Sequence, residues 1–180
     1  MYATILLVAA VMALALGGDL RKIALIDIKR LPWILVSFAL PLAVPLALRA
    51  GLDSGLTSVV LTVLTYGMLF YGLAANLRLP GVRLIGLGYL ANLAAVVANS
   101  FRMPVSLEMF EPALRAQEAA RLAASLTHAP LEATARLVFL ADVIPWRLLG
   151  KPSMVSIGDI AIALGVGYLV FRSAEPRCFR

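Results

Sequence analysis

Long apolar runs alternate with short polar segments along almost the whole chain of 180 residues. Five of these runs approach or reach the roughly 20 apolar residues that a helix needs to cross a bilayer. They are 2–16, which extends to Gly18, and 31–50, 56–75, 84–98 and 156–171. We expect each of the five to form a membrane-inserted helix.

A sixth apolar run, Leu131–Ile144, is shorter and carries Glu132, Arg136 and Asp142. A run of this length is more typical of a buried or re-entrant helix than of a full span. No Ser/Gly-rich linker or low-complexity segment divides the chain. The pattern therefore predicts an all-α fold, a polytopic transmembrane helical bundle with five or six membrane-inserted helices, formed by residues 1–180 as a single domain.

Two segments have an amphipathic pattern and are too charged to cross a membrane. Residues 19–30 place six charged side chains around a few aliphatic ones, which is typical of an interfacial helix, or alternatively of a face that docks a partner. Residues 107–127 follow Ser106, a good N-cap. We expect this second segment to be a surface helix in which Glu111 pairs with Arg115. Its inward residues would be Leu107, Phe110, Leu114 and Leu122.

Composition supports a membrane protein. Hydrophobic residues make up 62% of the chain and charged residues 14%, with a mean hydropathy of +0.93, whereas soluble domains are about half apolar and a quarter charged. The net charge of +6 comes from basic residues at the ends of apolar runs, so it indicates contact with anionic membrane lipids and not with nucleic acid. A lone cysteine, Cys178, and a lone histidine, His128, predict neither a metal site nor a cofactor.

The basic residues leave the orientation open. Arg21, Lys22, Lys29 and Arg30 follow the first run and predict a cytoplasmic loop there. Arg172, Arg177 and Arg180 favour a cytoplasmic C-terminus. The two signals agree if the chain crosses five times, with the N-terminus outside, and they conflict if it crosses six times.

Small and breaking residues predict how the helices pack. Gly86, Gly88 and several alanines in the fourth run permit close contact with another helix. Pro41 and Pro45 in the second run predict a kink. Asn92 and Asn99 are seven residues apart, so they fall on one face of the fourth helix.

Asp142 and Asp159 are the candidate functional residues. Asp142 ends one apolar run and Asp159 begins the next, and a short loop with Pro145, Trp146 and Pro152 joins the two. So short a connection would hold both carboxyls at one depth. Ionisable groups at membrane depth are candidates for function, and two close carboxyls share a proton, as in aspartic proteases.

A structural role explains the same acids. Ser156-Ile157-Gly158-Asp159 fits the acidic form of a capping box, and an acid in the first turn of a helix is stabilised by the helix dipole. Asp142 would lie at the unfavourable end of a helix dipole, so this explanation fits it less well.

Three motifs carry a resemblance to a known family: NSFRMPV at 99–105, LADVIP at 140–145 and SIGD at 156–159. The chain resembles small, functionally uncharacterised bacterial multi-pass membrane proteins that usually show Asn-Gly-Gly-Arg-Met-Pro-Val, Ala-Asp-x-Ile-Pro and Ser-Ile-Gly-Asp. Here Ser100 and Phe101 replace the two glycines. The resemblance implies a fold and a bacterial cytoplasmic membrane location, but no activity.

The stretch from 140 to 165 also resembles, more distantly, the lipoprotein signal peptidases. Asp159, Ile162 and Gly165 reproduce the Asp-x-x-Ile-x-x-Gly spacing of that family's last helix, and Asp142 stands where its other catalytic acid would be. The resemblance implies that Asp142 and Asp159 form a catalytic dyad. Ser156 would replace an Asn of the family motif, and Asn99 and Arg102 would echo its Asn-x-x-Asp-Arg motif as supporting groups.

The functional expectation is a membrane-embedded aspartic-dyad hydrolase that acts on a peptide or a lipid-linked substrate. The alternative is a non-catalytic subunit or scaffold, whose Gly/Ala faces and amphipathic helix pack against other membrane proteins in a larger complex. A small transporter or lipid binder is less favoured, because the middle runs contain no charge.

Overall fold

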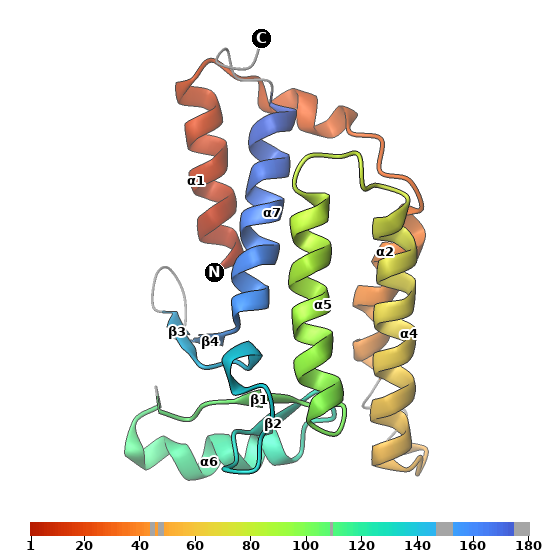
Figure 1. Cartoon of the computed structure of the whole chain (residues 1–180), viewed down its shortest axis with the longest axis vertical. Coiled ribbons are helices and arrows are strands. Elements are labelled where there is room, and N and C mark those ends of the chain that lie inside the picture. The colour runs from red at the N-terminus through yellow and green to blue at the C-terminus, as the bar shows by residue number, and fades with distance from the viewer. Residues whose placement is uncertain (44–45, 47–48, 109, 147–152, 175–180) are drawn as a thin grey trace.

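The computed structural model describes residues 1–43, 46, 49–108, 110–146 and 153–174. Five long helices stand side by side in the order α1, α7, α5, α4, α2 across the molecule (Figure 1). Their bounds are α1 Tyr2–Ala15, α2 Leu31–Ala39, α4 Ser54–Ala74, α5 Val82–Ala98 and α7 Ile157–Ser173. Each of the five expected apolar runs therefore contains a helix. Pro45, Pro152, Arg177, Cys178 and Arg180 lie outside the described residues.

A small irregular layer closes the end of the bundle at which α5 ends and α7 begins (Figure 1). It contains the parallel pair β1 and β2, the antiparallel pair β3 and β4, and helix α6. Bounds are β1 Met103–Val105, α6 Pro112–Ala123, β2 His128–Pro130, η3 Val138–Leu140, β3 Ile144–Trp146 and β4 Ser153–Val155. At the opposite end lies the 3₁₀ helix η1, Leu20–Leu25.

Glycines bring α5 and α7 into close contact. A Cβ added at Gly88 would lie 2.5 Å from the Gly158 carbonyl oxygen and 2.9 Å from the Ile162 amide nitrogen, which are backbone atoms that cannot move aside. Gly165 approaches Ile85 and the Gly81 carbonyl in the same way. Gly88 of the fourth run therefore serves a contact within the chain.

Aliphatic side chains from α4, α5 and α7 fill the centre of the bundle. The buried cluster is Leu69, Leu73, Val82, Ile85 and Ile162. Burying an aliphatic side chain contributes roughly 1.5–3 kcal/mol, so this cluster fixes the positions of the three helices that carry the polar pocket described below.

The second apolar run breaks where its prolines predict. The α-helix of α2 ends at Ala39, and the chain continues as the 3₁₀ helix η2, Leu40–Ala43. Pro41 has no N–H to donate to the preceding turn, so the helix cannot continue in α form.

The prediction of a helix over Leu131–Ile144 is wrong. In this segment only η3 is helical, and the residues before it form turns. Leu137 has φ 51°, in the left-handed region, which an α-helix cannot contain. The connection between the two acids is correspondingly a β-hairpin with paired residues Ile144 and Val155, and not a loop between two helices.

The two amphipathic segments are helical over shorter stretches than predicted. The segment 19–30 forms η1, with Asp19 as its N-cap. In 107–127 the helix begins only at Pro112 with Glu111 as N-cap, so Ser106 is not the cap. Leu122 is buried as expected, but Leu114 is 46% exposed. Arg115 donates to the carbonyls of Phe110 and Glu108 and not to Glu111.

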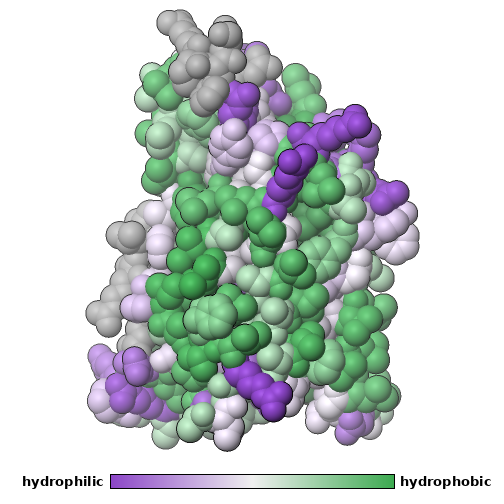
Figure 2. Space-filling model, viewed as in Figure 1, coloured by the Kyte–Doolittle hydropathy of each residue, from purple (hydrophilic) through white to green (hydrophobic). Residues whose placement is uncertain are grey.

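Within the described residues one helix, α4, is long and apolar enough to cross a membrane by length and composition, and α1, α2 with η2, and α5 are shorter apolar helices. Figure 2 shows that hydrophobic residues cover most of the middle of one face, while hydrophilic residues gather near its two ends. Large aliphatic side chains that are more than half exposed occur on all five long helices, among them Leu7, Leu35, Val63, Leu87 and Leu164.

Candidate functional site

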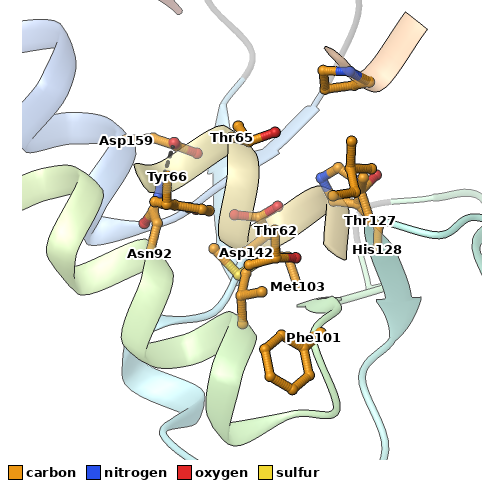
Figure 3. A pocket seen from close by; sticks show the side chains of 13 residues that line it. Thr62, Thr65, Tyr66, Asn92, Phe101, Met103, Thr127, His128, Asp142 and Asp159 are labelled. Carbon is orange, nitrogen blue, oxygen red and sulfur yellow. Dashed lines mark hydrogen bonds between the residues drawn. The ribbon is translucent and has the colours of Figure 1, made fainter. Parts of the chain in front are cut away.

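A pocket of about 190 Å³, lined by both polar and apolar residues, lies where α4, α5 and the start of α7 meet the irregular layer. Both candidate acids line it (Figure 3). The other polar lining residues are Thr62, Thr65, Tyr66, Asn92, Thr127 and His128, and the apolar ones are Pro41, Leu61, Val96, Phe101 and Met103. The pocket is therefore formed by residues from distant parts of the sequence.

The backbone of Asp142 is fixed beside β1. Its amide donates to the Pro104 carbonyl at 3.0 Å, and its own carbonyl accepts from the Ser106 amide at 2.9 Å. These two bonds add the residue as a short third strand next to Val105. The position of Asp142 is thus set by sheet pairing, since no helix carries it.

The Asp142 carboxyl is buried, and one of its oxygens lacks a hydrogen-bond donor among the described residues. The residue is 8% exposed, and the unpartnered atom is Oδ1. Burial, with a smaller contribution from the nearby charge of Asp159, raises the pKa of the Asp142 carboxyl from 3.8 to about 7. This carboxyl therefore keeps its proton to a much higher pH than an ordinary aspartic acid does.

Asp159 has the opposite environment, because three donors surround it. Its Oδ1 accepts from the Asn92 amide at 2.9 Å and from the Tyr2 hydroxyl at 3.1 Å, and its Oδ2 accepts from the Ser156 backbone amide at 3.2 Å. The Asp159 amide in turn donates to the Ser156 hydroxyl, so the predicted capping box is confirmed. A carboxylate has about four lone-pair positions, so one on Oδ2 remains unoccupied.

Asn92 and Ser156 fix the orientation of Asp159. The Ser156 hydroxyl donates to Asn92 Oδ1 at 2.8 Å, which turns the Asn92 amide nitrogen toward Asp159 (Figure 3). Ser156 is completely buried. Gly158 makes the arrangement possible, because a Cβ there would overlap the Asn92 side chain.

The hairpin explains why both acids reach one pocket. Ile144 pairs with Val155, so the strands that carry Asp142 and the start of α7 leave the hairpin side by side. Among the described residues no hydrogen bond joins the two carboxyls directly. Both carboxyls line the pocket, and the charge of Asp159 contributes to the raised pKa of Asp142.

The other two predicted supporting residues lie elsewhere. Asn99 donates to the carbonyls of Ala95 and Arg136 and accepts from the Arg136 amide, so it fastens the segment before η3 to the end of α5. Arg102 donates to the carbonyls of Leu122, Ala123 and His128, and so closes the C-terminus of α6. Neither side chain lines the acid pocket. Their roles in the structure are those of clamps between elements.

Ser100 and Phe101 both adopt left-handed backbone conformations, with φ of 55° and 62°. Glycine adopts this region without strain, which explains why a Gly-Gly pair is suited to the turn between α5 and β1. In this chain the second position carries a side chain that lines the acid pocket. Phe101 therefore narrows a space that glycine would leave open.

Sequence reasoning did not single out as functional the pocket residues Thr65, Tyr66, Thr127 and His128, nor Tyr2, which does not line the pocket but bonds Asp159. Tyr2 contacts Asp159 only because α1 packs on α7. The Thr65 hydroxyl is buried without a partner in the same pocket as Asp142. Asn92 was visible in the sequence, as a polar residue on the face it shares with Asn99. In the part of the chain that the structure describes, no group of three His, Cys, Asp or Glu side chains could hold a metal ion.

The structure thus defines a mainly helical protein with a two-acid pocket at one end of its bundle. The chain belongs to the family of unknown function DUF5317, which it matches over residues 25–171. It is 30% identical over 119 residues to an uncharacterised protein of Thermotoga maritima, an alignment that spans 66% of this chain and 66% of that protein. No solved structure matches the chain. The expected membership of an uncharacterised family is confirmed, and the resemblance to lipoprotein signal peptidases stays a prediction.

Proposed function

We propose that this protein is a multi-pass protein of the bacterial cytoplasmic membrane, with α1, α2, α4, α5 and α7 crossing the bilayer. The exposed aliphatic side chains on these helices support the proposal, because soluble monomers rarely expose apolar patches larger than a few hundred Å². The segment Leu131–Ile144 contains no α-helix, only the short 3₁₀ helix η3, and this reduces the six candidate crossings to five.

The charges favour an orientation in which the acid pocket opens outside the cytoplasm. Among the described residues, the end with η1 and the α4–α5 turn carries seven basic and two acidic side chains. The end with the acid pocket carries five basic and seven acidic ones. Basic residues gather on the cytoplasmic side of membrane proteins, and this supports an orientation with η1 inside and the pocket outside.

In this pocket we propose acid–base hydrolysis by Asp142 and Asp159. Asp159 is an acceptor with one free position on Oδ2, where a water molecule can bind. Asp142 holds a proton near neutral pH. The observation that carries the proposal is the contrast between two carboxyls that line one small pocket. Asp159 accepts three hydrogen bonds, whereas a buried oxygen of Asp142 accepts none from the described residues. Such different surroundings suit one carboxyl to act as base and the other as acid.

The reaction would move one proton through each acid. Water adds to the carbonyl carbon of an ester or amide and gives its proton to Asp159. Asp142 gives its proton to the leaving oxygen or nitrogen as the bond to carbon breaks. The proton on Asp159 then returns to Asp142 through solvent, which restores the starting state.

The alternative, a scaffold that packs through its Gly/Ala faces, has less support. The glycine face of α5 is already covered by α7 of the same chain. It is therefore not available to another membrane protein.

The proposal can be tested without a known substrate. Purified protein is incubated with a bacterial membrane extract in ¹⁸O-labelled water, and products that gain ¹⁸O are identified by mass spectrometry. We expect products with the wild-type chain and none with Asp142→Asn or Asp159→Asn, while Asp27→Asn, which changes an exposed acid at the other end, behaves like wild type. Equal labelling by wild type and both acid variants would overturn the proposal.

A further inference from the structure

A cleft of about 680 Å³ lies between η1 and the α4–α5 turn, at the end of the bundle opposite the acid pocket. Three basic side chains line it, Lys22, Lys29 and Arg78, against one acid among the described lining residues, Asp27. The volume falls within the roughly 300–1,000 Å³ typical of pockets for small ligands. The cleft therefore has the size and the excess of positive charge that a bound anion needs.

Hydrogen bonds hold both walls of the cleft in place. On one side the buried Asn76 side chain accepts from the Lys29 amide at 2.9 Å and donates to the Lys29 carbonyl at 2.7 Å. On the other side the Asp19 amide donates to the Ala174 carbonyl at 2.8 Å, which fastens the start of η1 to the end of α7. The cleft is thus formed before a ligand binds, so that little backbone ordering opposes binding.

Capping of α4 does not explain the basic side chains. Lys and Arg near a helix C-terminus can donate to its last carbonyls. At the end of α4, however, the Gly72 carbonyl accepts from the Ala75 amide and from the Asn76 side chain. Among the described residues, no hydrogen bond or ion pair engages the Lys29 ammonium or the Arg78 guanidinium. Both cations are therefore available to a ligand.

A phosphate group suits these donors, and a lipid suits the edge of the cleft. Arg binds phosphate through two parallel N–H bonds, and Lys binds it as a point charge. Leu25 also lines the cleft and is 80% exposed, so an apolar side chain lies beside the basic ones. In an anionic phospholipid the phosphate is likewise next to the acyl chains. In the proposed orientation the cleft faces the cytoplasmic surface, where basic pockets between helices bind phospholipid head groups.

We propose that this cleft binds a phosphate group through Lys29 and Arg78, and that the phosphate belongs to an anionic phospholipid. The site is separate from the acid pocket, and the proposal does not depend on the hydrolase function. A soluble phosphate ester offers the same phosphate without acyl chains. The experiment therefore compares the two sources.

Native mass spectrometry of the full chain in an uncharged detergent can measure the binding. The three ligands are phosphatidylglycerol, the soluble ester glycerol 3-phosphate, and diacylglycerol, which has acyl chains but no phosphate. We expect the wild-type chain to bind phosphatidylglycerol more tightly than either of the others. Arg78→Gln and Lys29→Gln should each raise the Kd for phosphatidylglycerol about fivefold, and the double variant about 25-fold, which is the usual effect of removing one or two basic residues at a membrane surface.

Two arginines at the same end of the bundle provide matched controls. Arg21 and Arg83 are exposed and do not line the cleft. Arg21→Gln and Arg83→Gln remove the same charge and should leave the Kd for phosphatidylglycerol unchanged. Glu175→Gln tests whether an acid of the chain itself competes for the basic side chains, and it should also leave the Kd unchanged.

Each other outcome has a defined meaning. Equal losses of affinity in the cleft variants and the control variants would show attraction to the whole basic surface and overturn the proposal. Diacylglycerol bound as tightly as phosphatidylglycerol, or binding that appears only in Glu175→Gln, would also overturn it. Glycerol 3-phosphate bound as tightly as phosphatidylglycerol, with the same losses in Arg78→Gln and Lys29→Gln, would refute the lipid as the source and leave the phosphate site standing.

Discussion

Replacing Asp142 with Asn should change the pH dependence of stability in a direction that can be worked out from the structure. The carboxyl is buried, its Oδ1 lacks a partner, and its pKa rises from 3.8 in its ordinary state to about 7 in the folded protein. At a pH below 3.8 the carboxyl is neutral in both the folded and the unfolded chain, so it causes no penalty. Above 3.8 the unfolded chain loses this proton while the folded chain keeps it.

The penalty therefore grows as the pH rises from 3.8 to 7 and is complete above 7, where the folded chain must carry a poorly solvated charge. At 1.36 kcal/mol for each pKa unit, it reaches about 4 kcal/mol at most. Asn has a similar shape and never ionises. Asp142→Asn should thus be close to wild type in stability at pH 4 and more stable at pH 8.5.

Thermal unfolding followed by tryptophan fluorescence in detergent can measure the difference, since Trp33 and Trp146 report on opposite parts of the chain. For a chain of this size 1 kcal/mol corresponds to roughly 2–4 °C in Tm, so the variant should gain on the order of 10 °C relative to wild type between pH 4 and pH 8.5. Asp27→Asn, at an exposed acid, is the control and should follow wild type at both values. A gap between Asp142→Asn and wild type that is the same at pH 4 and pH 8.5 would refute the reasoning.

Three further predictions test the packing, the strained turn and the orientation. Gly88→Ala should destabilise the fold by roughly 1–3 kcal/mol because its Cβ meets backbone of α7, while Gly86→Ala, which meets nothing within 4 Å, should not destabilise it in the same denaturation assay. Ser100→Gly should stabilise by about 1 kcal/mol, by relieving a left-handed residue; no change in the unfolding midpoint would contradict this. In a Cys178→Ser background, a membrane-impermeant maleimide added to intact cells should label Ser100→Cys and not Arg78→Cys, and the reverse pattern would invert the proposed orientation.

Activity in the ¹⁸O assay should fall as the pH rises through about 7, because Asp142 must carry its proton to protonate the leaving group. A rate that keeps rising up to pH 9 would exclude Asp142 as the acid.

The five long helices could be predicted from the sequence, and the irregular layer at the end of the bundle could not. Runs of fifteen or more apolar residues have few ways to satisfy their backbone other than as helices, so the five long helices lie where the sequence places them. The prediction of a helix over Leu131–Ile144 failed because the hydrogen bonds of this segment go to distant parts of the chain. The Leu131 amide donates to the Val105 carbonyl and the Arg136 amide to Asn99. Such pairing has no signal in local periodicity.

The site was predictable in part for a similar reason. A short connection between two acids brings them to one end of the bundle whether it is a helical hairpin or, as here, a β-hairpin, so Asp142 and Asp159 could be selected from spacing alone. Asn92 could not be assigned a role, because its contact with Asp159 depends on the glycine packing of α5 on α7. Asn99 and Arg102 were chosen from a motif, but their donors are used by backbone carbonyls.

The capping role of Asp159 and a chemical role for it are compatible, because the capping box occupies only some of its acceptor positions. The Ser156 amide, the Asn92 amide and the Tyr2 hydroxyl hold the carboxylate still and leave one position on Oδ2 for water. Asp142 has no comparable structural use. A buried carboxyl without a donor lowers stability by a few kcal/mol near neutral pH, and Asn or Leu would avoid this cost at the same place. Acid–base chemistry can use a buried carboxyl such as Asp142 in the same pocket as the well-oriented Asp159 carboxylate. A bundle with a purely structural role has no use for a group that lowers its stability. The Asp142 carboxyl is therefore the strongest argument that this end of the molecule has a chemical function.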